Sequence, residues 1–182
     1  MTKMLLFFDR VKSKIQKLYR CRLFREKTGC ACPNLQISGK IYVINRNIRV
    51  GVNCLIMPGV QFFGDGPIVL GDGVSIGNNT MLYASKDGGI TIGDNTMVAA
   101  DCYIIDADHG IRVGTPICKQ PNTVKRVQIG SDVWLATGVK VLRGSEIGDG
   151  AVIGALSLVK GKVESNAVAC GIPAKLLKYR EG

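Results

Sequence analysis

The stretch 133–159, VWLATGVKVLRGSEIGDGAVIGALSLV, decides the fold because it repeats a unit of six residues. An aliphatic residue recurs at every sixth position, namely Leu135, Val141, Ile147, Ile153 and Val159. Glycine follows two of them, and glycine permits the positive backbone φ angle that a tight corner needs. Each unit therefore predicts a short strand with one inward side chain, followed by a corner. Three units would close a triangular coil, and stacked coils would pair their backbones about 4.8 Å apart.

The same period extends over most of the chain from residue 41, with interruptions. The earlier repeats carry their aliphatic or aromatic residue at Ile44, Val50, Ile56, Phe62, Leu70, Ile76, Leu82, Ile92, Val98, Ile104 and Ile129. Small residues usually stand four positions later, where Cys54 and Cys102 are expected to act as small buried hydrophobic residues. About sixteen repeats predict about five coils of a mainly β solenoid over residues 34–182. The period does not give the hand, although the general crossover rule favours a right-handed coil.

The N-terminal segment, residues 1–33, has a different pattern. Phe8, Val11, Ile15 and Leu18 recur at helical spacing between Lys and Arg residues. Residues 1–30 hold +7 of the net charge of +10. Two compatible interpretations stay open: a helix that caps the solenoid with its apolar stripe on the core, or a basic amphipathic helix in which residues 1–28 contact an anionic membrane. Gly29 and Pro33 are expected to end the helix.

Composition and charge exclude several classes of protein. No apolar run approaches the roughly 20 residues of a membrane span, and no secretory signal is visible. Seven scattered cysteines without zinc-ligand spacing indicate free thiols in a reducing cytoplasm. Because the basic charge is confined to one end, nucleic acid is not an expected partner. We therefore expect a cytoplasmic protein, at the inner face of the membrane if the basic segment binds there.

The stretch IIDADHGIRVG, residues 104–114, holds the only histidine, His109. It follows the last in-register aliphatic residue and opens an excursion loop at 106–128. A neutral imidazole is suited to act as a general base at cellular pH, and loops that leave a regular scaffold often carry function. Asp106 is a candidate to orient the ring, with backbone carbonyl groups as competitors. Asp108 is expected to point to the opposite face of an extended segment.

Several motifs in order resemble the hexapeptide-repeat acyltransferases over residues 40–180. They are the hexapeptides, the break that bears the histidine, the 133–159 run and the closing ACGIPAK at 169–175. Within these enzymes the match is to the galactoside/maltose and polysaccharide O-acetyltransferase branch. The resemblance implies a left-handed parallel β-helix, a homotrimer and acetyl-CoA as donor, with His109 as the base. The end segments are expected to form an N-terminal helix and a short C-terminal helix.

The resemblance also implies positions that contact the substrates. Asn79 and Asp87 match the acceptor contacts, which stand 13 and 5 residues before the corner at Ile92. The donor contacts match Thr137, Ala155, Lys160, Gly161, Lys175 and Lys178. The family often has Thr-Lys at 160–161 and Arg at 175 and 178, so this chain keeps the charge but not the guanidinium. Asn79 could equally be an ordinary corner residue, and the last lysines could be a solvated helix face.

These features favour acetyl-CoA-dependent O-acetylation of a sugar hydroxyl. The carbohydrate acceptor would be a surface polysaccharide (capsule, O-antigen or exopolysaccharide) or its precursor. Two alternatives stay open: N-acetylation of an amino sugar or nucleotide amino sugar with the same base, and a non-catalytic β-helix. No metal is expected, because one histidine per chain is a poor start for the three-histidine zinc site found in other proteins of this fold.

Overall fold

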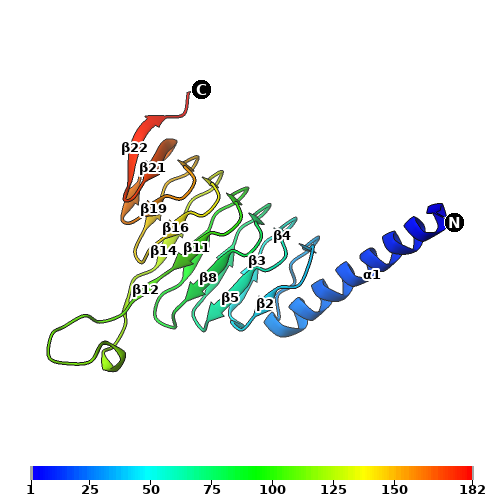
Figure 1. Ribbon diagram of the computed structural model, residues 1–182, viewed down its shortest axis with the longest axis horizontal. Helices are drawn as coiled ribbons and strands as arrows, with labels where there is room; N and C mark the ends of the chain where they lie inside the picture. Colours follow the sequence, from blue (N-terminus) through cyan, green and yellow to red (C-terminus); the bar gives the residue numbers. More distant parts are fainter. Residues whose placement is uncertain (1, 182) are drawn as a thin grey trace.

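The computed structural model describes residues 2–181, and the side chains of these residues except 2–5 and 9. Short parallel strands stack into a three-sided solenoid, with one helix at the N-terminal end and one long loop leaving the stack (Figure 1). The solenoid is a left-handed parallel β-helix, as the resemblance implies. The right-handed expectation is wrong here, because that rule concerns long crossovers on a twisted sheet and not tight corners between short strands.

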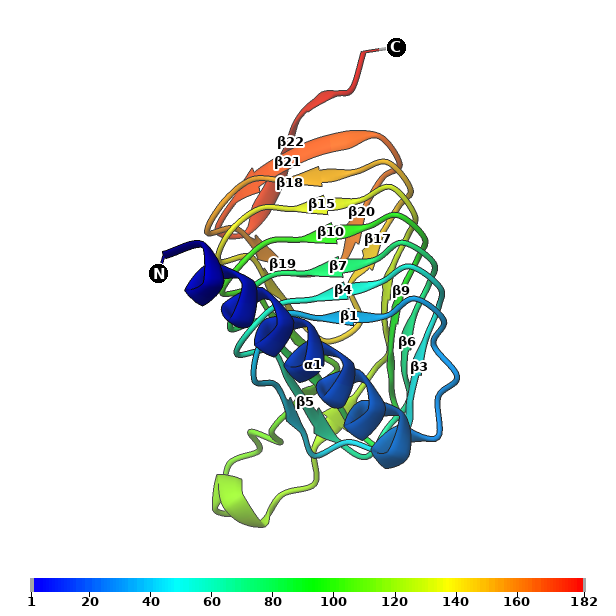
Figure 2. The same cartoon turned by 90° about the vertical axis from the view of Figure 1, so that its right-hand side faces the viewer.

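Each side of the solenoid is one parallel sheet. Sheet A contains β1 (Gln36–Ile37), β4 (Leu55–Ile56), β7 (Ser75–Ile76), β10 (Met97–Val98), β15 (Trp134–Leu135), β18 (Val152–Ile153) and β21 (Ala167–Gly171), and ends with the antiparallel β22 (Ala174–Tyr179). Sheet B contains β2 (Tyr42–Val43), β5 (Gln61–Gly64), β8 (Met81–Ala84), β11 (Tyr103–Ile105), β16 (Lys140–Val141) and β19 (Leu158–Val159). Sheet C contains β3 (Ile48–Val50), β6 (Ile68–Leu70), β9 (Ile90–Ile92), β14 (Val127–Ile129), β17 (Glu146–Ile147) and β20 (Lys162–Val163). Figure 2 shows the strands of sheet A stacked in order.

The solenoid has about seven turns, not the five predicted. The prediction missed turns at both ends, where β1 precedes the first repeat recognised and β20 and β21 follow the last one. The missed repeats lack the aliphatic-glycine pair that marks a corner elsewhere. Hydrogen bonding to the neighbouring coil supplies the order that the local sequence does not specify.

The predicted inward positions form the core. Every aliphatic or aromatic residue of the series is at most 6% exposed except Ile44, and the two predicted small positions, Cys54 and Cys102, are buried as well. Ile44 was expected to point inward but is 63% exposed. Its neighbour Asn45 is buried instead, because its side-chain amide donates hydrogen bonds to the carbonyl groups of Phe63 and Gly66.

Three corners join the sheets, and we name them by the sheets they connect: corner AB, corner BC and corner CA. At corner AB one residue of each coil from the second to the sixth adopts a positive φ angle: Gly59, Asn79, Asp101, Gly138 and Leu156. Asn and Asp tolerate this left-handed conformation better than other residues with a Cβ atom, whereas leucine is strained there. Both long insertions in the repeat, 85–89 and 106–126, leave the solenoid at corner BC.

The short C-terminal helix was predicted wrongly. The segment 174–179 is β22, which folds back on β21 as an antiparallel strand with a register shift between Val168 and Ala169. Without β22, the last coil would leave a row of unpaired N–H and C=O groups at the edge of sheet A. Pairing with that edge outweighs the helical tendency of a short segment rich in Lys and Leu.

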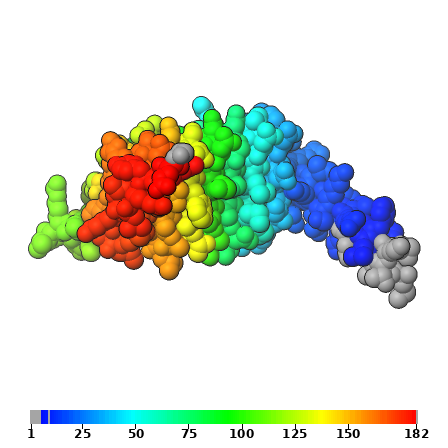
Figure 3. Space-filling view, turned by 90° about the horizontal axis from the view of Figure 1, so that it is seen from above, coloured from blue at the N-terminus to red at the C-terminus, as the bar shows by residue number. Residues whose placement is uncertain are grey.

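Helix α1 (Thr2–Thr28) confirms the predicted N-terminal helix and ends just before Gly29. Phe24 and Cys21 are buried against the first coil, and the ring of Phe24 lies 6.1 Å from that of Phe62. The expected packing of the apolar stripe is wrong, because Phe8, Ile15 and Leu18 are 60%, 61% and 64% exposed. The first half of the helix extends away from the solenoid (Figures 1 and 3). No helix in the described residues is long and apolar enough to cross a membrane.

Candidate active site

The excursion at corner BC is a closed loop with a defined base. Its two ends pair as antiparallel β12 (Ala107–Asp108) and β13 (Thr123–Val124), and its tip holds a short 3-10 helix, η1 (Ile117–Lys119). The side chain of Gln120 fastens the loop: it accepts from the backbone N–H of Arg112 at 2.8 Å and donates to the carbonyl of Thr115 at 2.7 Å. The loop protrudes from the side of the solenoid (Figures 1 and 3). Sequence analysis did not single out Gln120, whose role depends on contacts within the loop.

His109 stands directly after β12, where the loop leaves the solenoid. Its side chain is exposed and lines a cavity of about 750 Å³ between the loop and the next coil. Because β12 is hydrogen bonded to β13 and follows a buried strand, the backbone at His109 has little freedom. The histidine predicted to be the base is therefore held in the wall of this cavity.

Arg143 reaches this cavity from the following coil. Its Nε donates to Asp108 Oδ2 at 2.8 Å, which orients Asp108 along the wall of the cavity. Arg112 and Lys119 also line the cavity, so its cations outnumber its one carboxylate. A cavity of this charge attracts anionic groups. Nothing in the sequence marked Arg143, because only the stacking of coils brings residues 108 and 143 together.

Asp106 is fully buried and is bonded to a different segment from the one expected. Its carboxylate accepts from the backbone N–H of Ser85 at 2.9 Å and from that of Gly89 at 2.6 Å. Its two oxygens thus hold the ends of the 85–89 insertion, and no hydrogen bond joins it to the His109 ring in the described structure. A glycine is required at 88, since an added Cβ atom would collide with the Asp106 carboxylate. Asp106, which was predicted to orient His109, thus holds the two ends of the 85–89 insertion.

The two predicted acceptor contacts lie at different corners. Asp87 is exposed on the 85–89 insertion at corner BC, the corner that bears His109. Asn79 occupies corner AB with a φ angle of 57°, and its amide donates to Asp101 Oδ1 at 3.2 Å. The full length of a sheet B strand separates the two corners. The chain by itself therefore does not bring Asn79 to Asp87 and His109.

The predicted donor contacts also divide between the corners. Thr137 and Ala155 are exposed on successive coils of corner AB, where the N–H of Leu156 donates to the Thr137 carbonyl at 2.9 Å. Leu156 keeps a strained left-handed backbone there, with φ at 59°, and its side chain is 69% exposed. Strain of this kind persists where the surrounding structure and function require it. Thr137 and Ala155 thus occupy equivalent positions on successive coils of corner AB, whereas Asn79 is equivalent to Leu156.

The predicted lysine contacts lie toward the C-terminal end of the solenoid. Lys175 pairs with Cys170 and Lys178 pairs with Val168 in the β21–β22 hairpin. Lys160 and Gly161 form the last corner BC, between β19 and β20. All four are exposed, and the lysines are therefore available to an anionic ligand.

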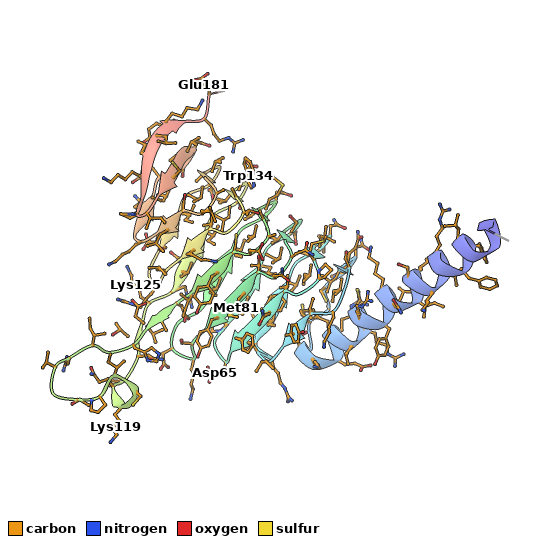
Figure 4. All side chains as sticks on the ribbon, viewed as in Figure 1. Asp65, Met81, Lys119, Lys125, Trp134 and Glu181 are labelled. Atoms are coloured by element: carbon orange, nitrogen blue, oxygen red, sulfur yellow. The ribbon has the colours of Figure 1, made fainter. Side chains whose placement is uncertain are left out.

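The outer faces of the sheets differ in character. Sheet C presents polar and charged residues, including Arg49, Gln128 and Glu146. Sheet B presents a half-buried cluster of large side chains at Phe63, Met81, Tyr83, Tyr103 and Ile105, which we call the sheet B cluster (Figure 4, where Met81 is labelled). Burial, and then the neighbouring Tyr83, raise the pKa of the Tyr103 phenol. An apolar face with a neutral phenol is suited to contact another protein surface.

The cysteines are free thiols and most are buried. Burial raises the pKa of Cys54 and of Cys102, and it raises the pKa of Cys32 to about 11. Cys118, in η1, is exposed. In the described residues, no group of three His, Cys, Asp or Glu side chains is arranged to hold a metal ion.

The stacked hexapeptide coils, with a histidine on an excursion at one corner, define a hexapeptide-repeat β-helix protein. The family model of bacterial hexapeptide transferases (six repeats) matches residues 126–161. The chain is 33% identical over 134 residues to WcaF of Escherichia coli, assigned to colanic acid biosynthesis as an acetyltransferase, with 72% of this chain and 69% of WcaF covered. The chain therefore belongs to the hexapeptide-repeat transferase family.

Two further relatives are longer than the region they share with this chain. WbbJ of Escherichia coli, assigned as a lipopolysaccharide biosynthesis O-acetyl transferase, is 36% identical over 124 residues, with 64% of this chain and 62% of WbbJ covered. Rv3034c of Mycobacterium tuberculosis, classed as an acetyltransferase, is 37% identical over 118 residues, with 64% of this chain but 39% of Rv3034c covered. Among solved structures, the N-acyltransferase AntD from Bacillus cereus, as its D94A mutant in complex with dTDP and coenzyme A, superimposes with a TM-score of 0.76 at 21% identity, covering 88% of each chain. That likeness establishes the fold.

Proposed function

We propose that this protein is an acetyltransferase that moves an acetyl group from acetyl-CoA to a hydroxyl group of a sugar, with His109 as general base. The observation that carries the proposal is the position of the single histidine. It lines the cavity beside the excursion, on a backbone held by the β12–β13 pair. The acetyltransferase assignments of the relatives support the reaction class.

The reaction needs one base and one leaving group. The sugar hydroxyl attacks the thioester carbonyl while the neutral His109 ring takes the hydroxyl proton. The carbon–oxygen bond forms, the tetrahedral intermediate collapses, and the carbon–sulfur bond breaks. The imidazolium then returns the proton to the departing thiolate, so free coenzyme A and the acetylated sugar leave with the base restored. Asp106 contributes by holding the 85–89 insertion, which carries Asp87 beside the acceptor.

The donor is proposed to bind along corner AB. The exposed corner residues Thr137 and Ala155 and the overhanging Leu156 offer a groove edge for the long pantetheine arm. Lys175 and Lys178 would meet its phosphates as point charges, and Lys160 with Gly161 would contact it from corner BC of a neighbouring chain. Asn79 lies at the same corner, and contact with corner BC of a neighbouring chain would bring it toward an Asp87 and a His109, so Asn79 stays assigned to the acceptor.

A homotrimer would complete the site. Donor residues at corner AB and His109 at corner BC lie at opposite ends of sheet B, so one chain cannot bring them together. Contact between neighbouring chains would set corner AB of one against corner BC of the next and would cover the sheet B cluster. Most soluble oligomers are closed and symmetric, and a triangular prism suits a threefold arrangement.

The relatives and the charge of the cavity support the proposed class of acceptor. Two relatives are assigned to the biosynthesis of surface polysaccharides, which supports a glycan hydroxyl or its precursor as acceptor. The second candidate is N-acylation of a nucleotide-linked amino sugar, which the AntD structure with bound dTDP favours. The cations Arg112, Lys119 and Arg143 would suit a nucleotide diphosphate as well as an acidic glycan.

The test is a comparison of His109→Ala with the wild type. We expect the variant to fold and to bind coenzyme A, but to transfer acetyl groups about 10²–10⁴-fold more slowly, because the attacking hydroxyl loses its base. The assay measures release of coenzyme A thiol with matched hydroxyl and amino sugars, free and nucleotide-linked. Gln128→Ala, on the outer face of sheet C, serves as the control. Near-wild-type turnover by His109→Ala would refute the role of the base, and failure of the wild type to bind coenzyme A would favour a non-catalytic β-helix.

A further inference from the structure

Among the described side chains of helix α1, the polar and buried contacts with the first coil gather on one face. Lys17 Nζ donates to Gln36 Oε1 at 2.7 Å, and Arg20 donates to a backbone carbonyl of the first coil. Cys21 and Phe24 are buried on the same side. These contacts lie in the second half of the helix, whereas the first half extends away from the solenoid (Figure 1). Because the helix is continuous, the contacts of its second half also fix which way each face of its first half points.

The apolar stripe of α1, Phe8, Val11, Ile15 and Leu18, points away from this docked face. At 3.6 residues per turn, the centre of the stripe lies roughly 150° around the helix from the centre of the contacting residues. Its members are 39–64% exposed. Phe7 and Tyr19 border the stripe and are 61% and 65% exposed. A helix that only capped the solenoid would have no reason to hold four apolar residues on the opposite side.

The charges around the stripe favour an anionic partner. Lys12 and Lys14 flank the stripe on its two sides, and residues 1–30 hold +7 of the net +10. A second copy of this helix would bring two strongly positive segments together, which costs free energy. The remaining 152 residues carry a net +3 and so provide no excess of acidic charge to meet it. Lys3 and Asp9 contribute to the count, but their side chains lie outside the described residues.

We infer that the stripe binds the surface of a lipid bilayer that contains anionic lipids. The apolar residues would enter the boundary between head groups and acyl chains, and the lysines and arginines would meet the head groups. The rings of Phe7, Phe8 and Tyr19 are suited to the interfacial depth. The helix would lie on the bilayer and hold the solenoid beside it. The inference stands on the geometry of α1 and does not depend on the acetyltransferase assignment.

Vesicle flotation of the full-length protein tests the inference, with phosphatidylglycerol–phosphatidylcholine vesicles compared with phosphatidylcholine alone. We expect binding to the anionic vesicles that falls when salt is raised from about 0.1 M to about 0.5 M, because the electrostatic part is screened. Leu18→Gln should weaken binding about fivefold to tenfold, because its side chain leaves water on binding. Leu6→Gln is the matched control: Leu6 is 55% exposed on the opposite face, and its loss should change binding less than about twofold.

The outcomes separate the possible occupants of the stripe. Equal binding to neutral and anionic vesicles, no binding, or equal effects of Leu18→Gln and Leu6→Gln would overturn the inference. A lower oligomer mass for Leu18→Gln in sedimentation, with vesicle binding unchanged, would show that the stripe contacts a second copy instead. Acetyl transfer to a soluble sugar, measured in the same preparations, reports on the proposed function separately.

Discussion

At the scale of single residues, the buried Asp106 illustrates how a site residue can act through another segment. Its carboxylate is enclosed, fully buried, between two backbone N–H groups of the 85–89 insertion. A buried carboxylate is costly unless its oxygens are hydrogen bonded, and both oxygens are bonded here. The residue therefore couples the shape of the Asp87 loop to the strand that leads into His109.

Replacement of Asp106 by Asn should loosen that loop without unfolding the solenoid. The new side-chain NH₂ group would face a backbone donor, and an unsatisfied buried group costs about 1–3 kcal/mol. We expect the amides of Ser85 and Gly89 to exchange hydrogen about 10–100-fold faster, and acetyl transfer to fall while the affinity for coenzyme A is kept. Asp65→Asn, exposed at corner BC of an earlier coil (Figure 4), is the control. Unchanged rates of hydrogen exchange at both amides would contradict this role of Asp106.

The Cys32 thiol links stability to alkaline pH. Burial raises its pKa from 9.0 to about 11 in the folded protein. Below pH 9 the thiol is protonated in both states, so its contribution is complete. As pH rises from 9 to 11, the unfolded chain loses this proton and the folded protein keeps it, so stability falls. We expect the free energy of unfolding, measured by urea titration, to fall less across this range in Cys32→Ala than in Cys118→Ala, whose thiol is exposed. Parallel curves for the two variants would rule the linkage out.

At the scale of elements, sequence patterns predicted what local chemistry specifies and missed what neighbours impose. The hexapeptide period identified the inward residues of the coils between Val50 and Val159, because an inward position must be apolar whatever lies beside it. The end coils were missed, since hydrogen bonds to a neighbouring coil stabilise them more than their own corners do. The segment 174–179 became β22 for the same reason: an open sheet edge was available to it.

The candidate site shows the same difference between features visible in the sequence and features that depend on contacts in the fold. The two insertions that carry Asp87 and His109 could be predicted, because an irregular segment in a regular chain is visible in the sequence, whereas the roles of these two residues come from the family resemblance and stay predictions. Arg143 could not be predicted, because only the stacking of coils brings it to Asp108, 35 residues away. Gln120 could not be predicted, because the conformation of the loop brings it to Arg112, 8 residues away. The direction of the α1 stripe could not be predicted either, since helical spacing defines a face but not what that face meets.

At the scale of the whole molecule, the outer face of sheet B decides how chains would assemble. Phe63, Tyr83 and Ile105 stand in register across three strands and leave a half-buried apolar surface. The proposed trimer uses this surface to unite the donor and acceptor corners. Assembly and catalysis are therefore expected to be lost together.

Ile105→Glu tests this dependence. A charge in the sheet B cluster should be too costly to bury between chains, so we expect a trimer in the wild type and single chains in the variant. The rate of acetyl transfer should fall about tenfold or more, because each site loses the residues that the neighbouring chain supplies. Sedimentation velocity gives the mass, and Gln128→Glu on sheet C is the control. A wild type that is active as a single chain would remove the basis for the shared site.

The closed base of the excursion has a consequence for the evolution of this scaffold. Because β12 and β13 pair before the loop begins and the coil resumes in register at β14, the 110–122 segment can change length without disturbing the stack. In the proposed function, the cavity cations Arg112 and Lys119 are thus carried on a replaceable segment, while His109 and the proposed donor corner stay on the stacked coils. We therefore expect a graft of a foreign loop between residues 109 and 123 to change the preference for the acceptor and to leave the binding of coenzyme A in place.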